Sequence, residues 1–222
     1  MVNKVIHVKD LVKRYNNRTP VLDGISFDVS EGEFVIVYGK SGCGKTTLLN
    51  ILGGLDRPTS GDVTIDGQNI IGLAEDELAR IRLQKIGFVF QDYNLLGDLT
   101  IRENVALPLK FSKKPDKGRV DALLAKFDIT QIANETANKV SGGEAQRASI
   151  ARAMMNDPKI ILADEPTGNL DLDNTERVIS AFEIARKDFG STVVLATHDN
   201  ELGKRATTRI YLPGLSSGPV IS

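Results

Sequence analysis

The feature that most limits how this chain can fold is a glycine-rich loop between an apolar segment and a helical one. Residues 34–38 (FVIVY) are an unbroken apolar run, residues 39–46 read GKSGCGKT, and residues 47–52 continue in a helical pattern. Every fixed position matches the phosphate-binding P-loop, in which a buried strand passes through the loop into a helix. A glycine-rich turn can match by chance, but the complete pattern and both flanks favour a phosphate site in an α/β fold.

The residue types of this loop suit a triphosphate and its metal ion. Its glycines let backbone N–H groups approach phosphate oxygens closely, and the start of the following helix adds a favourable dipole. Lys45 would place positive charge on the β- and γ-phosphates, and Thr46 would ligate Mg²⁺, which prefers oxygen ligands. Cys43, at a free position of the pattern, suits a small filler better than a nucleophile. The expected ATP contacts are Gly39, Lys40, Ser41, Gly42, Cys43, Gly44, Lys45, Thr46 and Thr47.

A second apolar run ends in two acids. Residues 160–163 (IILA) lead directly into Asp164 and Glu165. Carboxylates at the end of a buried strand are costly unless a cation or a catalytic task holds them there. Solvated acids at an ordinary strand end are the alternative, but the P-loop in the same chain favours chemistry. We expect Asp164 to bind Mg²⁺ through water and Glu165 to polarise the water that attacks the γ-phosphate.

Residues 140–144 (VSGGE), followed by Gln146 and Arg147, resemble the signature motif of ABC ATPases. Ser141 and Glu144 also have the spacing of a capping box that opens a helix over 144–155, and both readings can hold. A capped helix start with two glycines presents many donors to a phosphate. The resemblance implies that these residues face the ATP held by a second subunit, and the set is Ser141, Gly142, Gly143 and Glu144.

Other landmarks of the ABC family follow in order along nearly the whole chain. Gln91, after an expected strand over 86–90, resembles the Q-loop glutamine, which reaches Mg²⁺ and the attacking water and acts as a hinge. His198 resembles the switch histidine that contacts the γ-phosphate, although a lone histidine is more often structural. Tyr15 resembles the aromatic residue that stacks on adenine, but a plain surface or core tyrosine remains an alternative. The stretch that resembles the D-loop, which crosses the dimer interface, is Asn169, Leu170 and Asp171.

The resemblance therefore implies a divided set of roles. The catalytic residues would be Lys45, Gln91, Glu165 and His198, and ATP would also contact Gln91, His198 and Tyr15. The Mg²⁺ ligands would be Thr46, Gln91 and Asp164. The cofactors implied are ATP and Mg²⁺.

The pattern of apolar and polar residues along the chain predicts one domain with three parts. Alternating segments over residues 5–37 suit a half-exposed antiparallel sheet, whereas the apolar runs 34–38, 160–163 and 193–196 suit parallel strands covered on both faces. Between the runs the pattern is helical, with a capping box at Thr100 and a helix over 117–127. We expect a RecA-like P-loop core with an antiparallel β subdomain (about 1–91 and 158–222) and an inserted helical subdomain (about 92–157). Residues 111–119 are interpreted as a solvated loop, and the tail after 212 as peripheral.

Charge and hydropathy limit the partners and the compartment. Lys and Arg number 28 against 29 Asp and Glu, so no nucleic-acid surface is expected. Cys43 is the only cysteine and the first residues lack a signal-peptide core, which favours a reducing cytoplasm. No apolar run approaches the roughly 20 residues of a spanning helix, so another chain would cross the membrane.

Three further stretches are most similar to the ABC subunits of lipoprotein release, macrolide or peptide export, and cell division: residues 92–96, 103–108 and 167–171. Val140 and Ala145 depart from the usual signature without removing a catalytic group. The resemblance implies a head-to-tail homodimer around two Mg-ATP that drives a separate permease, at the inner face of the cell membrane. Exposed apolar contacts for the permease, with core packing as the alternative, would be Tyr93, Leu95, Leu96 and Leu99.

Three alternatives stay open from the sequence. One is a regulatory scaffold of a membrane cell-division complex that uses ATP as a switch. A second is a soluble ABC protein that acts on ribosomes or DNA, which the single cassette and the balanced charge disfavour. The third is a P-loop kinase, which would need an acceptor site and a lid in place of residues 140–147.

Overall fold

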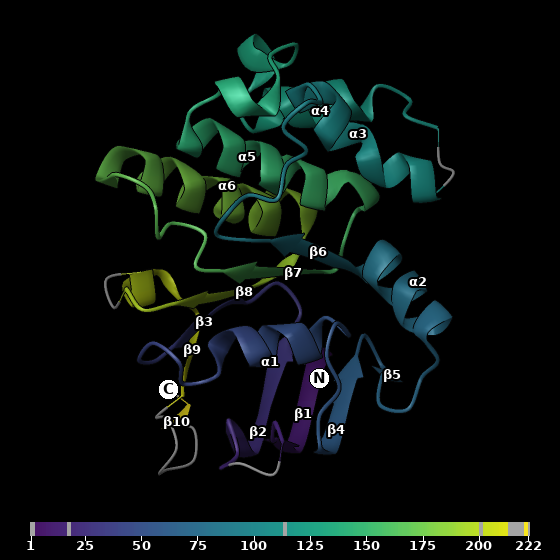
Figure 1. Ribbon diagram of the computed structural model, residues 1–222, viewed down its shortest axis with the longest axis vertical. Helices are drawn as coiled ribbons and strands as arrows, with labels where there is room; N and C mark the ends of the chain where they lie inside the picture. The colour runs from purple at the N-terminus through teal and green to yellow at the C-terminus, as the bar shows by residue number, and fades with distance from the viewer. Residues whose placement is uncertain (1–2, 17–18, 113–114, 200–201, 213–219, 222) are drawn as a thin grey trace.

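The computed structural model describes residues 3–16, 19–112, 115–199, 202–212 and 220–221, and it is layered around a six-stranded sheet (Figure 1). The strand order is β10-β9-β3-β8-β7-β6, and β3, β6, β7, β8 and β9 are parallel. Only β10 runs antiparallel to its neighbour. The strands are β3 (Phe34–Tyr38), β6 (Ile86–Val89), β7 (Ile160–Asp164), β8 (Thr192–Thr197), β9 (Thr208–Tyr211) and β10 (Val220–Ile221).

The apolar runs predicted as two-sided buried strands are confirmed as the centre of this sheet. Successive side chains of a strand point to opposite faces, so each run supplies two separate cores. Val35 and Val37 pack with helix α1 (Lys45–Leu52) on one face. Phe34 and Ile36 pack on the other face with α6 (Leu172–Phe189), below α5 (Gly142–Ala153) in the view of Figure 1. An unbroken apolar sequence is therefore required here.

A second sheet, antiparallel throughout, covers the far side of α1 (Figure 1). Its order is β2-β1-β4-β5, with β1 (Lys4–Lys13), β2 (Leu22–Ser30), β4 (Ser60–Ile65) and β5 (Gln68–Asn69). The antiparallel prediction for the N-terminal segments is confirmed, but its limit at residue 37 was wrong, because β3 belongs to the parallel sheet. Strands β4 and β5 were not predicted, since their short polar sequences carry only two buried side chains in β4.

Helices α3 (Ile101–Ser112), α4 (Arg119–Lys126) and α5 form a layer beyond the parallel sheet (Figure 1). The predicted capping box is confirmed: the Thr100 N–H donates to Glu103 over 2.8 Å, and the Glu103 N–H donates to the Thr100 hydroxyl over 3.2 Å. The layer also contains the short 3₁₀ turns η1 (Thr130–Ile132), η2 (Ala137–Lys139) and η3 (Met154–Asn156). Outside it lie α2 (Glu75–Lys85), which was not predicted, and η4 (Leu202–Arg205).

Two sequence expectations about connections are corrected. The solvated loop expected over 111–119 is narrower, because α3 continues to Ser112 and α4 begins at Arg119, whose guanidinium donates to the carbonyls of Met154 and Met155. Residues 213–219 of the expected peripheral tail lie outside the described part, but Val220–Ile221 form β10 on the parallel sheet. None of the described helices combines the length and the apolar character needed to cross a membrane.

Candidate functional site

The glycine-rich loop joins β3 to α1 and depends on its glycines. Gly44, which caps α1, has φ +104°, and Gly42 has φ +77°, a region that side chains disfavour. A Cβ at Gly39 would lie 2.5 Å from the Leu212 carbonyl oxygen and 2.6 Å from the Cys43 sulfur. Cys43 is itself buried. One side of the loop therefore packs against the protein, where Cys43 fills a small space as expected. The other side borders a cavity.

A cavity of about 420 Å³ opens in front of this loop. Residues from four separate parts of the chain meet there: the loop with the first turn of α1, and the segments that follow β6, β7 and β8. Carboxyl ends of parallel strands share one edge of a sheet, which is where such clefts form. The lining residues are Val21, Ser41, Gly42, Gly44, Lys45, Thr46, Thr47, Gln91, Glu165 and His198.

The charged groups of the cavity contact one another directly. Lys45 Nζ donates to the Gly39 carbonyl over 3.0 Å and lies 3.3 Å from Glu165 Oε1. Glu165 Oε2 lies 2.9 Å from His198 Nδ1. The backbone of Glu165 has φ +46°, an unfavourable conformation that the surroundings must hold. The acid predicted to polarise water is thus fixed between the predicted lysine and the predicted histidine.

Asp164, at the end of β7, has the surroundings of a metal ligand. Burial raises the pKa of its carboxyl group, against the hydrogen bond from Thr46, and its buried Oδ1 atom has no hydrogen-bond partner among the described residues. Mg²⁺ is commonly held by one or two carboxylates together with substrate phosphates and water. The described residues contain no cluster of three or more His, Cys, Asp or Glu, so the nucleotide would have to supply further ligands. Thr46 and Asp164 therefore fit a magnesium ion that arrives with its triphosphate.

Tyr15 lies beside the cavity and does not line it. The residue is 44% exposed, its hydroxyl donates to Asp56 Oδ2 over 2.7 Å, and Lys13 Nζ lies 4.5 Å from the ring centroid. Burial and this hydrogen bond raise the pKa of the Tyr15 hydroxyl. The ring is held in place and accessible, so stacking on a base stays a prediction. Lys40, also predicted to contact ATP, is exposed and does not line the cavity.

The signature residues are assembled elsewhere. Ser141 caps α5, and its N–H and hydroxyl donate to Glu144 over 2.9 and 2.6 Å, which lowers the pKa of Glu144. The capping box is thereby confirmed, although α5 begins at Gly142 rather than at 144. A Cβ at Gly143 would lie 2.2 Å from Asn174 Oδ1, so α6 packs directly on the motif. Residues 141–144 are not among the described residues that line the cavity.

The segments that resemble the Q-loop and the D-loop contact each other. Gln91 Nε2 donates to Asn169 Oδ1 over 3.3 Å, and Asp171 caps α6 by accepting the Asn174 N–H over 2.8 Å. A Cβ at Gly142 would lie 2.6 Å from the Tyr93 hydroxyl and 3.3 Å from Leu170. Both loops therefore connect the cavity to the signature helix.

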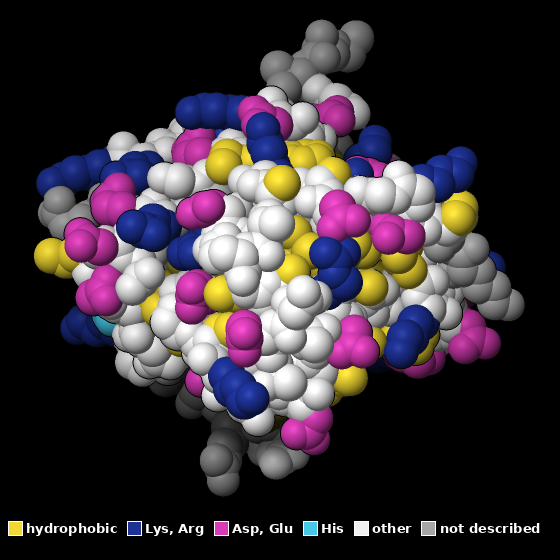
Figure 2. All heavy atoms as spheres, turned by 90° about the horizontal axis from the view of Figure 1, so that it is seen from above, with side chains coloured by type: hydrophobic (Ala, Val, Ile, Leu, Met, Phe, Trp, Pro, Cys, Tyr) yellow, Lys and Arg dark blue, Asp and Glu magenta, His cyan; other side chains and the backbone are white. Residues whose placement is uncertain are grey.

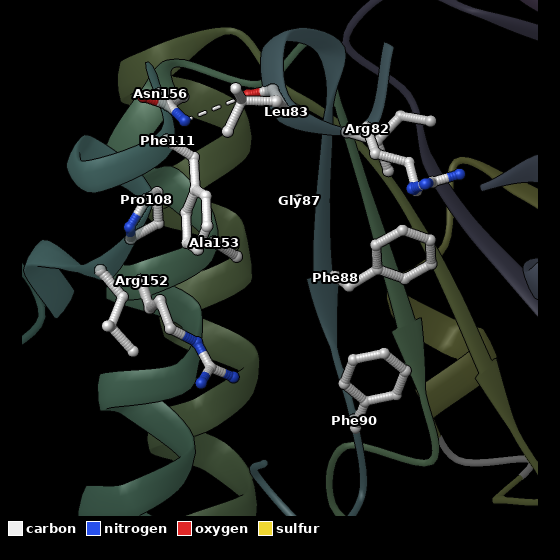
Figure 3. Close-up of a pocket in the computed structure, with 12 residues that line it drawn as sticks. Arg82, Leu83, Gly87, Phe88, Phe90, Pro108, Phe111, Arg152, Ala153 and Asn156 are labelled. Carbon is white, nitrogen blue, oxygen red and sulfur yellow. Dashed lines mark hydrogen bonds between the residues drawn. The ribbon is translucent and has the colours of Figure 1, made fainter. Parts of the chain in front are cut away.

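A second cavity, of about 270 Å³, lies between strand β6 and helix α3 (Figure 3). Sequence reasoning missed it, although Phe88 and Phe90 alternate along an edge strand and their rings stack 5.6 Å apart. Of the apolar contacts predicted for a permease, Leu96 is exposed, whereas Tyr93, Leu95 and Leu99 are half-buried, and none lines this groove. The lining residues are Arg82, Leu83, Ile86, Gly87, Phe88, Phe90, Leu107, Pro108, Phe111, Arg152, Ala153 and Asn156.

Together, the fold and the first cavity define a P-loop nucleotide-binding protein of the α/β class. A family model described as "ABC transporter" matches residues 22–168. The chain therefore belongs to the ATP-binding domains of ABC transporters.

Individual relatives agree with this assignment. The chain is 43% identical over 210 residues to the macrolide export ATP-binding/permease protein MacB of Syntrophobacter fumaroxidans, but spans only 29% of that protein's length. It is 44% identical over 200 residues to the ABC transporter ATP-binding protein YxdL of Bacillus subtilis, covering 88% of this chain and 78% of that protein.

Solved structures give the same result. A dimeric, post-hydrolysis structure of the ATP-binding cassette MJ0796 bound to ADP and Pi superposes with a TM-score of 0.85 at 38% identity, covering 96% of this chain and 97% of that one. The structure of cbiO1 from Clostridium perfringens, part of the transporter complex cbiONQ, has a TM-score of 0.89 at 25% identity, covering 98% and 87%. The predicted fold class, a parallel-sheet core with an antiparallel sheet and a helical layer, is confirmed.

Proposed function

We propose that this protein binds and hydrolyses Mg-ATP as the motor subunit of an ABC transporter. The observation that carries the proposal is the meeting of Lys45, Gln91, Glu165 and His198 around one cavity in front of the P-loop. Phosphoryl transfer needs mainly positioning and charge stabilisation, which converging groups on rigid strand ends can supply. The post-hydrolysis state of MJ0796, with ADP and Pi, supports the same chemistry.

The residues divide the work by their positions. Lys45 and the loop N–H groups hold the β- and γ-phosphates, and the γ-phosphate displaces Glu165 from its contact with Lys45. Glu165 then accepts a hydrogen bond from the attacking water, while His198 and Gln91 contact the γ-phosphate and that water. Thr46 and Asp164 would hold Mg²⁺, and the ion would supply positive charge against the phosphate oxygens.

The proposed active unit is a dimer, because the signature residues 141–144 are not among the described residues that line the P-loop cavity of their own chain. The capped start of α5, which carries these residues, offers donors suited to a phosphate. MJ0796 forms a dimer with the same fold. Leu172, the residue after Asp171, is 84% exposed, and an exposed large apolar side chain at this place suits a protein–protein interface. Two chains arranged head to tail would each close the other's site.

A mixing experiment tests the shared site. Ser141→Arg blocks the signature and Lys45→Ala disables the P-loop, so neither variant hydrolyses ATP alone. A mixed dimer keeps one complete site, so an equal mixture should recover about a quarter of wild-type activity if chains pair at random. No recovery while mixed dimers are demonstrably present would contradict the proposal.

The groove in Figure 3 is the proposed docking site for a separate permease at the inner face of the membrane. Its walls are apolar, and its two charged side chains, Arg82 and Arg152, are both cationic. An apolar segment that carries a carboxylate would complement them. Seen from above, the helical face shows apolar side chains lying among charged ones (Figure 2). The permease part of the longer MacB relative supports such a partner.

Membrane capture tests this docking site. Phe111, 71% exposed in the groove, and Leu55, 50% exposed and outside it, are matched apolar positions. Phe111→Asp should abolish co-purification with a membrane protein that stimulates ATP hydrolysis, and Leu55→Asp should not. Equal retention by both variants would exclude this groove. A partner that binds only in the presence of ATP, without transport, would favour the regulatory scaffold.

A further inference from the structure

The segment that follows Gln91 has an unfavourable backbone conformation at two consecutive residues. Tyr93 and Asn94 have φ values of +60° and +49°. Two consecutive non-glycine residues in the left-handed region are unfavourable and persist only where surrounding groups fix them. Within the segment, the Tyr93 N–H bonds to the Phe90 carbonyl over 3.2 Å and the Asn94 N–H to the Asp92 carbonyl over 2.6 Å. These local hydrogen bonds do not use the carbonyl groups of Tyr93 and Asn94, which another part of the chain must bond.

Helix α5 holds this segment on both sides of Gln91. Gln146 Nε2 donates to the Phe90 carbonyl over 3.3 Å, before Gln91. After Gln91, the guanidinium of Arg152 donates to the Tyr93 carbonyl over 2.9 Å and to the Asn94 carbonyl over 2.5 Å. The planar fork of an arginine can bond two adjacent carbonyls at once, which a lysine cannot reproduce. The two strained residues are thus held by one side chain.

Arg152 also belongs to the groove. It projects from α5 on the same side as Pro108, Phe111 and Ala153, and its guanidinium points across the gap toward β6 (Figure 3). The side chain is partly shielded, so an occupant of the groove would pack against the group that holds the loop. Arg152 is therefore part of the signature helix α5, lines the groove, and bonds the backbone that follows Gln91.

We propose that Arg152 is a positioning residue that sets the place of Gln91 in the ATP site by holding the backbone that follows it. The inference rests on the proposed role of Gln91 and goes beyond it, because Arg152 does not line the ATP cavity. It acts through the backbone of residues 93 and 94. Loss of its two bonds frees the loop and leaves the P-loop intact.

Hydrogen exchange tests whether Arg152 holds the loop, and kinetics test whether that hold matters for ATP hydrolysis. In Arg152→Met, the amides of residues 93–96 should exchange at least about tenfold faster, whereas those of α6 should not change. The kcat for ATP should fall at least about tenfold with little change in KM, because Gln91 is misplaced rather than removed from a binding role. Arg152→Lys, which keeps the charge but not the fork, should lie between.

A double-mutant cycle separates positioning from a general structural effect. If Arg152 acts through Gln91, adding Arg152→Met to Gln91→Ala should lower kcat by no more than about twofold further. Arg82→Met is the matched control: Arg82 lines the same groove and bonds the Gly54 carbonyl over 2.7 Å, far from Gln91 in the chain. It should leave exchange at 93–96 unchanged.

Three results would overturn the proposal: unchanged exchange at 93–96 in Arg152→Met, an equal loss of kcat with and without Gln91, or the same effects from Arg82→Met. A wild-type protein that does not hydrolyse ATP would instead refute the proposed function. In that case the exchange experiment, which needs no turnover, still decides whether Arg152 holds the loop.

Discussion

Asp164 and Glu165 are neighbours in the chain with different surroundings. Burial raises the pKa of Asp164, and one of its oxygens has no partner among the described groups. Glu165 lies between Lys45 and His198, and a positive φ turns it out of the strand direction. Two adjacent carboxylates can take different roles when their surroundings differ in this way. The first suits a metal ion and the second suits a water molecule.

Replacing Asp164 by Asn should stabilise the nucleotide-free protein at neutral pH. Because the folded-state pKa of Asp164 lies above its unfolded value of 3.8, the protein loses stability as pH rises through that interval, and Asn removes this loss. The gain should be modest, because solvent screens part of the charge. Thermal unfolding at pH 4 and pH 7 measures it, and the variant's advantage should be larger at pH 7 than at pH 4. An advantage that is equal at both values would contradict the assigned pKa.

Glu165→Gln should keep ATP binding and lose turnover by at least about 100-fold, because the amide has the same shape but cannot accept a proton. ATP should then hold the variant as a dimer on a sizing column. Lys45→Ala is the control: it should weaken ATP binding in calorimetry and form no such dimer. Normal hydrolysis by Glu165→Gln would disprove the role given to this acid.

Helix α3 depends on one buried amide at its start. Asn104 is fully buried, accepts the Leu96 N–H over 2.8 Å, and donates to the carbonyls of Leu96 and Thr100 over 3.0 Å. The loop that leads from the Q-loop segment into α3 is therefore closed around this side chain. Nothing in the sequence pattern distinguished Asn104 from a surface residue, because its partners are backbone atoms brought near only by folding.

Asn104→Ala should lower the free energy of unfolding by about 2–3 kcal/mol, since it leaves buried backbone groups unsatisfied. Asn138→Ala is a suitable control, because the side-chain hydrogen bond that Asn138 accepts from the Thr136 hydroxyl is exposed, and the loss should stay within about 0.5 kcal/mol. Urea unfolding of both variants makes the comparison. Equal midpoints would show that Asn104 does not organise the loop.

Among the helices and strands, the sequence predicted those with a clear apolar or capping pattern. The apolar runs gave β3, β7 and β8, and the capping boxes gave the starts of α3 and, within two residues, α5. It missed α2, whose eleven residues bury only Leu78 and Ile81, and the short strands β4 and β5. A helix with a mainly polar surface gives little periodicity to detect.

For the whole molecule, sequence motifs predicted which residues meet but not how the sites are joined. Lys45, Gln91, Glu165 and His198 line one cavity as expected, and the signature residues do not line it. The groove and the Arg152 contacts could not be predicted, because they join side chains and carbonyls 58 and 59 positions apart. Such contacts depend on packing between layers, which local pattern does not specify.

The proposed dimer requires that a single copy of the chain hold only part of its active site. The direct measurement is ATP hydrolysis per chain over a dilution series, with the fraction of dimer measured at each concentration by sedimentation. The activity per chain should fall in proportion to the dimer fraction and approach zero for the monomer. A monomeric sample that hydrolyses ATP as fast per chain as a concentrated one would contradict the account.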